Sequence, residues 1–151
     1  MKRNRKIGSI TPALTNTTKT TVRFSEVDSM QVVWHGEYVR YFEDGREAFG
    51  RKYPGIGYHD FYAYGYTAPI VDLQLQYVAP LTVNDVAIIE TRLIDTAAAK
   101  LCFEYIIHRE CDGALVARGS SVQVFVDSDG NMCLNNPTFF EVWKRRWLTK
   151  Q

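Results

Sequence analysis

Hydrophobic side chains along this chain follow the period of a helix once and the period of a strand several times. From Glu37 to Tyr53 apolar residues recur every three or four positions, as on the buried stripe of an amphipathic helix. An acidic residue opens this segment, two basic residues close it, and Pro54 follows where the helix has to stop. The pattern predicts one long helix, in which Gly45 indicates a close packing contact.

Around this helix, apolar and polar residues alternate with the period of two that is typical of β-strands. The predicted strands are Thr20–Phe24, Thr67–Tyr77, Val83–Thr96, Leu101–Arg109 and Ala114–Val126. An Asp-Gly turn joins the last two as a hairpin, and Pro137–Trp147 predicts a short terminal helix with an aromatic face. One long helix among consecutive strands predicts an α+β fold, with a mostly antiparallel sheet curled around the helix.

The length of 151 residues fits a single domain. Residues 1–18 are polar, rich in Thr and without periodicity, which predicts a flexible basic arm ahead of one domain over residues 19–151. The first 23 residues hold six of the 18 basic residues and no acid, so the rest carries 12 minus 17, or −5. The charge is therefore uneven although its sum is +1.

The composition is 46% hydrophobic and 23% charged, as in an ordinary folded soluble protein. The near-zero charge argues against nucleic acid as the main partner. No stretch reaches the ~20 apolar residues of a membrane span, and the basic start lacks the apolar run of a secretory signal. Three cysteines without C-x-x-C spacing predict a reducing cytoplasm. Three widely spaced histidines predict no metal site, and the common nucleotide-binding motifs do not occur in the sequence.

Candidate chemistry lies between residues 22 and 43, where Asp28 stands in a loop and His35 directly precedes the predicted helix. Unpaired amides at a helix N-terminus attract an oxygen that gains negative charge during a reaction. A nearby carboxylate can act as a base or nucleophile on a carbonyl polarised in this way. On spacing alone, an Asp that bonds local amides and a packed or capping His are the commoner interpretation.

The same segment resembles the signature of the 4-hydroxybenzoyl-CoA thioesterase family of hotdog-fold enzymes. The matching residues are Asp28, Val32-Val33, Trp34-His35, Glu37-Tyr38 and Arg40-Tyr41-Phe42-Glu43. The similarity continues through Ala68-Pro69-Ile70-Val71, Tyr77-Val78-Ala79-Pro80, Asp85, Ala117-Arg118-Gly119 and Val126-Asp127. This resemblance, in the family's order from Thr20 to Pro137, implies the hotdog fold: a curved antiparallel sheet of about five strands around one central helix.

The resemblance implies an acyl-CoA thioesterase that needs no cofactor. Asp28 would be the general base or nucleophile, and the backbone N–H of His35 would polarise the thioester carbonyl. Val33, Trp34 and Tyr38 would line or flank the acyl pocket. Family members join their sheets edge to edge, so a homodimer or homotetramer with sites at the subunit interface is expected.

Two departures from the family pattern leave alternatives open. Gln31 stands where many relatives have glycine, and Ala97-Ala98-Ala99-Lys100 replaces an arginine-rich turn that meets CoA phosphates in the namesake enzyme. Lys100 keeps one possible phosphate contact, and the basic N-terminal arm or Lys144-Arg145-Arg146 would have to supply the rest. The alternatives are an acyl-carrier-protein thioesterase and a non-catalytic acyl-thioester binding module.

Glu43 and Glu47 on the predicted helix are further candidates, because another branch of hotdog enzymes uses a helical glutamate as its catalyst. A solvated helix face with charge partners such as Arg40 and Arg46 is the favoured interpretation.

Overall fold

The structure, a computed structural model, describes residues 6–148, and within them five strands and three α-helices. The strands are β1 (Leu14–Thr21), β2 (Ile70–Tyr77), β3 (Val86–Ile94), β4 (Lys100–Arg109) and β5 (Leu115–Val124). The helices are α1 (Glu37–Lys52), α2 (Tyr58–Ala63) and α3 (Thr138–Leu148), and a short 3₁₀ turn, η1, covers Phe24–Glu26.

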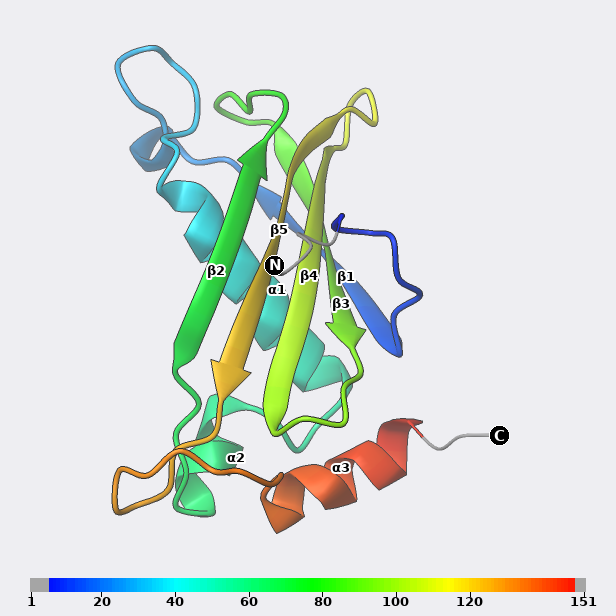
Figure 1. Cartoon of the computed structure of the whole chain (residues 1–151). Coiled ribbons are helices and arrows are strands. Elements are labelled where there is room, and N and C mark those ends of the chain that lie inside the picture. The colour runs from blue at the N-terminus through cyan, green and yellow to red at the C-terminus, as the bar shows by residue number, and fades with distance from the viewer. Residues whose placement is uncertain (1–5, 149–151) are drawn as a thin grey trace.

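The five strands form one antiparallel sheet in the order β1-β3-β4-β5-β2, and this sheet curves around α1 (Figure 1). On β4, four alternating side chains face the helix and are at most 3% exposed: Leu101, Phe103, Tyr105 and Ile107. Their alternation is what the sequence pattern predicted, because successive side chains of a strand point to opposite faces. The predicted α+β fold, with one long helix against the sheet, is confirmed.

A close contact between helix and sheet occurs at the glycine in the middle of α1. A β-carbon at Gly45 would overlap the hydroxyl of Thr91 and lie 2.9 Å from the methyl carbon Cγ2 of Ile89, both on β3. One turn earlier, the ring of Phe42 stacks on Tyr105 with a centroid distance of 4.3 Å and an interplanar angle of 8°. The close packing predicted from Gly45 is therefore confirmed.

The predictions for the N-terminal region are wrong in two respects. Residues 14–18, assigned to the flexible arm, belong to β1, which pairs with β3 from Leu14 opposite Leu93 to Thr21 opposite Val86. The strand ends at Thr21, and η1 follows at Phe24, so the predicted strand over residues 20–24 is displaced. Because β1 is an edge strand built mainly from threonine, it lacks the apolar alternation that reveals an inner strand.

Residues 6–13 of the predicted arm contact the face of the sheet that is opposite α1. The amide of Gly8 donates to Oε1 of Glu104 at 3.0 Å, and Arg92 donates to the carbonyl of Ile10 at 2.9 Å. Arg92 and Glu104 face each other across β3 and β4, and Glu104 is buried. Residues 1–5 of the predicted arm lie outside the described residues.

At the end of the sheet where β4 begins, α2 and α3 cover the core (Figure 1). The sequence pattern predicted no helix or strand where α2 lies, since a helix of six residues is too short for a clear period. In α3 the rings of Phe140 and Trp143 stack at 5.8 Å, and the indole N–H of Trp143 donates to the carbonyl of Tyr53 at 2.9 Å. Across residues 6–148, no helix has both the length and the apolar character to cross a membrane.

We expect Gly45→Ala to lower the free energy of unfolding by about 1–3 kcal/mol, because the added methyl group overpacks the contact with Thr91. Gly50→Ala in the same helix is the matched control, since its nearest neighbouring atoms lie 3.7 Å away or farther. That change should raise stability by up to about 1 kcal/mol through helix propensity. Urea unfolding measures both, and equal effects of the same sign would contradict the close contact.

Candidate active site

Asp28 lies in a tight hairpin between η1 and α1. Val27 pairs with Val33, the amide of Asp28 donates to the carbonyl of Val32 at 2.9 Å, and the amide of Gln31 donates to the carbonyl of Asp28 at 2.9 Å. These bonds close a three-residue loop, in which Gln31 adopts the left-handed conformation with φ of 66°. The hairpin therefore needs, at Gln31, the backbone conformation that glycine adopts most easily.

The carboxylate of Asp28 is half-buried and only partly engaged. Its Oδ1 accepts a hydrogen bond of 2.9 Å from the amide of Met30, which fixes the rotamer within the loop. Among the described residues, Oδ2 has no hydrogen-bond donor, so this oxygen is available to a water molecule or a substrate. No three His, Cys, Asp or Glu side chains within residues 6–148 gather in a way that could hold a metal ion.

The hairpin rests on the loop that precedes β3. The amide of Val33 donates to the carbonyl of Leu81 at 2.9 Å, and the amide of Val22 donates to the carbonyl of Asp85 at 2.8 Å. Leu81 and Val33 are both buried. Residues 80–85 thus hold the hairpin from both its flanks.

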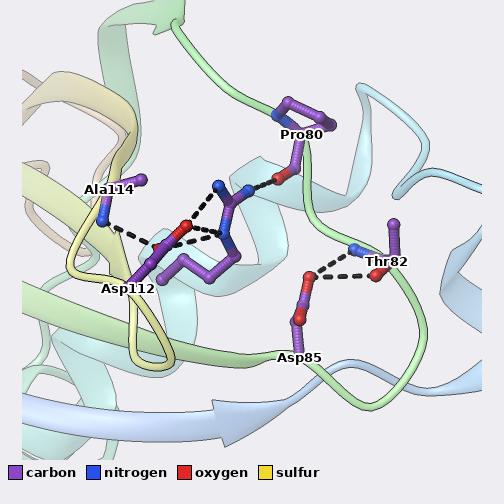
Figure 2. A network of polar contacts seen from close by, with 6 residues as sticks. Pro80, Thr82, Asp85, Asp112 and Ala114 are labelled. Atoms are coloured by element: carbon purple, nitrogen blue, oxygen red, sulfur yellow. Dashed lines mark hydrogen bonds and ion pairs between the residues drawn. The ribbon is translucent and has the colours of Figure 1, made fainter.

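Figure 2 shows the polar network that keeps this supporting loop in place. Arg109, at the end of β4, donates to the Asp112 carboxylate at 2.9 Å and to the carbonyl of Pro80 at 2.5 Å. The carboxylate of Asp85 accepts bonds from the amide and hydroxyl of Thr82 at 2.8 and 3.0 Å. Hydrogen bonds from Arg109 hold the pKa of the Asp112 carboxyl below its usual value. The β4–β5 turn is therefore linked through Pro80 and Leu81 to the hairpin.

The backbone N–H groups of His35 and Gly36, directly before α1, are unpaired among the described residues. The amide of Glu37 donates to the carbonyl of Trp34 at 2.9 Å, and the hydroxyl of Tyr77 donates to the carbonyl of His35 at 2.6 Å. Within residues 6–148, the N–H groups of His35 and Gly36 donate to no acceptor. They lie at the positive end of the helix dipole, which is where an anionic oxygen is stabilised.

The three predicted pocket residues differ in their exposure. Val33 and Tyr38 belong to the core, with 5% and 3% exposure, and Tyr38 packs edge-on against Tyr77 with ring centroids 5.2 Å apart. Trp34 is 50% exposed, and its ring covers Gly36 so closely that a β-carbon there would overlap it. Of the three, Trp34 is therefore the residue that presents its ring at the surface.

Lys100 lies far from Asp28 within one chain. It begins β4, whereas Arg109 ends this ten-residue strand next to the loop that supports Asp28. At ~3.3 Å per residue, the strand separates the two ends by about 30 Å. A second predicted basic source, Lys144-Arg145-Arg146, is near the Lys100 end, because Lys144 on α3 forms an ion pair of 2.8 Å with Asp95 after β3. One subunit thus brings Asp28 and His35 together but not Lys100.

A groove of about 1070 Å³ lies between the second half of α1, α2 and the start of β2. Glu43 and Arg46 line it from α1, Ile70 lines it from β2, and Gln123 lines it from β5. Glu43 is paired with Arg46 at 2.9 Å, as predicted for a solvated helix face. The sequence did not reveal this groove, because its walls come from segments that are far apart along the chain.

We expect Gln31→Gly to stabilise the protein. Glycine removes about 1–2 kcal/mol of strain from the left-handed conformation, which raises the free energy of unfolding. The greater conformational freedom of glycine in the unfolded chain lowers it by about 0.5–1 kcal/mol. The net gain of about 0.5–1 kcal/mol is measurable by urea unfolding. Ser29→Gly in the same loop, where φ is not positive, should instead lower stability. A loss of stability in Gln31→Gly would show that the glutamine side chain makes a favourable contact.

Comparisons of sequence and structure identify known proteins that are similar to this chain. Residues 22–147 match the family model of the Thioesterase-like superfamily. The chain is 31% identical, over 72% of its length and 77% of the relative, to the protein named "Putative acyl-CoA thioesterase YneP" of Bacillus subtilis (strain 168). It is 25% identical, over 71% of its length and 56% of the relative, to "Acyl-acyl carrier protein thioesterase ATL3, chloroplastic" of Arabidopsis thaliana.

The solved structure of a DHNA-CoA thioesterase from Staphylococcus aureus superimposes with a TM-score of 0.73. It is 25% identical to this chain, and the alignment covers 80% of each chain.

Proposed function

Because this chain belongs to the Thioesterase-like superfamily of hotdog-fold proteins, we propose that it is an acyl-CoA thioesterase with Asp28 and His35 in its active site. The observation that carries the proposal is the pairing of a partly free carboxylate with unpaired amides in one rigid hairpin-to-helix segment. The amide of Asp28 donates to the carbonyl of Val32, three residues before His35, so the carboxylate and the unpaired amides belong to one short segment. The substrate's thioester group would lie between the carboxylate and these amides.

In this proposal the amide N–H of His35 binds the thioester oxygen and stabilises the negative charge that develops on it. Asp28 either removes a proton from an attacking water molecule or attacks the acyl carbon itself. The carbon–sulfur bond breaks, the thiolate leaves and takes up a proton, and water provides the oxygen of the free acid. A thioester carbonyl has little resonance stabilisation and a good leaving group, so one carboxylate and aligned amides suffice.

We further propose that two subunits pair through β2. Seven of its eight residues are exposed, and they include the apolar side chains of Val71, Leu73 and Tyr77. The other edge strand, β1, is polar and carries Lys19, which is the composition that discourages strand pairing. An exposed apolar edge is a template for another strand, and a second copy of this chain satisfies it in a two-fold dimer.

Two-fold pairing of identical strands is antiparallel, so the start of one β2 meets the end of the other. Tyr77, bonded to His35, then lies beside the partner's Ile70, which lines the groove. In the sheet Ile70 is next to Gln123, and Gln123 is next to Leu101, so Lys100 lies at that same end. The dimer therefore supplies each Asp28 with an acyl groove and a phosphate contact, Lys100 of the partner subunit.

An acyl-carrier-protein thioesterase is the second candidate function, and two observations favour it. One relative carries that activity in its name, and the segment Ala97-Ala98-Ala99-Lys100 contains a single basic residue, Lys100 at the start of β4. A carrier protein would present the pantetheine arm without requiring a cationic turn on this chain.

Asp28→Asn should lower kcat for hydrolysis of acyl-CoA by about 10²–10⁴-fold, the usual contribution of a general base or nucleophile. Steady-state assays with a panel of acyl-CoA and acyl-carrier-protein thioesters measure this loss and identify the preferred carrier. Asp129→Asn, in an exposed turn, is the control and should keep full activity. Unchanged hydrolysis by Asp28→Asn would exclude the catalytic role, whereas tight binding without any hydrolysis by the wild type would indicate a binding module.

Lys100→Ala should raise KM for acyl-CoA by about 2–5-fold, as expected for one exposed ionic contact, and leave KM for the acyl-pantetheine ester unchanged. A mixed dimer of one Asp28→Asn subunit and one Lys100→Ala subunit tests whether the contact crosses the interface. Its single intact site should show the wild-type KM, because Asp28 and Lys100 of that site come from different chains. The raised KM of Lys100→Ala in the mixed dimer would place both residues in one subunit's site.

A further inference from the structure

Tyr77, the last residue of β2, makes a polar contact with the candidate site. Its hydroxyl donates to the carbonyl oxygen of His35 at 2.6 Å, although the two residues are 42 positions apart. This distance belongs to the short end of the range for hydrogen bonds between oxygens. The ring is held edge-on against the buried ring of Tyr38, and the backbone of Tyr77 pairs with Ala117 on β5. The hydroxyl is therefore carried on an ordered strand.

The bond to His35 determines the direction of the next amide. The carbonyl of His35 and the N–H of Gly36 belong to one planar peptide unit, and in a trans peptide they point in opposite directions. The preceding unit is held in the same way, because the Glu37 amide binds the Trp34 carbonyl and so directs the N–H of His35. Both unpaired amides thus belong to peptide units whose carbonyl oxygens accept a hydrogen bond.

We propose that Tyr77 is a positioning residue of the thioesterase site, whose hydroxyl holds the His35–Gly36 peptide so that the N–H of Gly36 joins that of His35 on the thioester oxygen. This inference rests on the proposed function. A hydrogen bond to the carbonyl also polarises the peptide, which makes its N–H a stronger donor.

Tyr77→Phe removes one oxygen atom and keeps the ring against Tyr38. We expect kcat to fall by about 10–100-fold with KM unchanged, because the amide is misdirected but not deleted; loss of a whole donor costs ~10²–10³-fold. Tyr53→Phe is the matched control, since the Tyr53 hydroxyl makes the same kind of bond, 2.8 Å to the carbonyl of Thr15, at the opposite end of α1. It should lower the melting temperature and leave kcat unchanged.

The possible results of these assays distinguish the positioning role of Tyr77 from the proposed thioesterase function. If Asp28→Asn is inactive and Tyr77→Phe retains the wild-type kcat, the positioning role is overturned while the thioesterase assignment stands. A raised KM with unchanged kcat would also overturn it, because Tyr77 would then bind substrate. If the wild type hydrolyses no thioester, both proposals are overturned.

Amide NMR supplies a readout that is independent of activity. Loss of the bond to the His35 carbonyl changes the polarisation of that peptide, so the ¹⁵N resonance of Gly36 should shift in Tyr77→Phe. The resonance should remain in place in Tyr53→Phe. An unchanged Gly36 resonance in Tyr77→Phe would overturn the proposed hold on this peptide.

Discussion

The packing of α1 into the concave face of the sheet is the interaction on which the other features depend. The absence of a side chain at Gly45 brings the helix backbone against Thr91 and Ile89 of β3. The ring of Phe42 then stacks on Tyr105. Because the helix packs this closely on the sheet, its first residues lie at the end of the sheet where residues 80–85 support the hairpin of Asp28. The candidate site is therefore a consequence of how the core is packed.

Much of the candidate site consists of backbone groups that are held by hydrogen bonds to other backbone groups and to one side-chain hydroxyl. Leu81 holds Val33, Glu37 holds Trp34, and the Tyr77 hydroxyl holds His35. Each of these bonds fixes one peptide plane, and the planes together direct the unpaired amides at the start of α1. Such a site needs few special side chains, which suits a reaction in which the substrate carbonyl is already reactive.

The proposed dimer accounts for two features of the single chain, the unpaired edge of β2 and the large distance between Lys100 and Asp28. Among the described residues, the outer edge of the apolar strand β2 is unpaired, and Lys100 lies about 30 Å along β4 from the end that supports Asp28. The proposed two-fold dimer through β2 would cover the edge and bring opposite ends of two sheets together. In that dimer the groove beside Ile70 would face the unpaired amides of the other subunit.

The sequence by itself determined the long helix, the inner strands and the position of Asp28 and His35 before the helix. These features depend on local periodicity and on residues that are close along the chain, such as the buried alternation of Leu101 to Ile107. It did not determine β1, because an edge strand of threonines has no apolar period, nor α2, which is too short to have one. Only the tertiary structure decided that Tyr77 reaches His35, that Lys100 lies at the far end, and that a groove forms beside Ile70. These relations join segments tens of residues apart, and their geometry is set by strand register and helix packing, which no local pattern encodes.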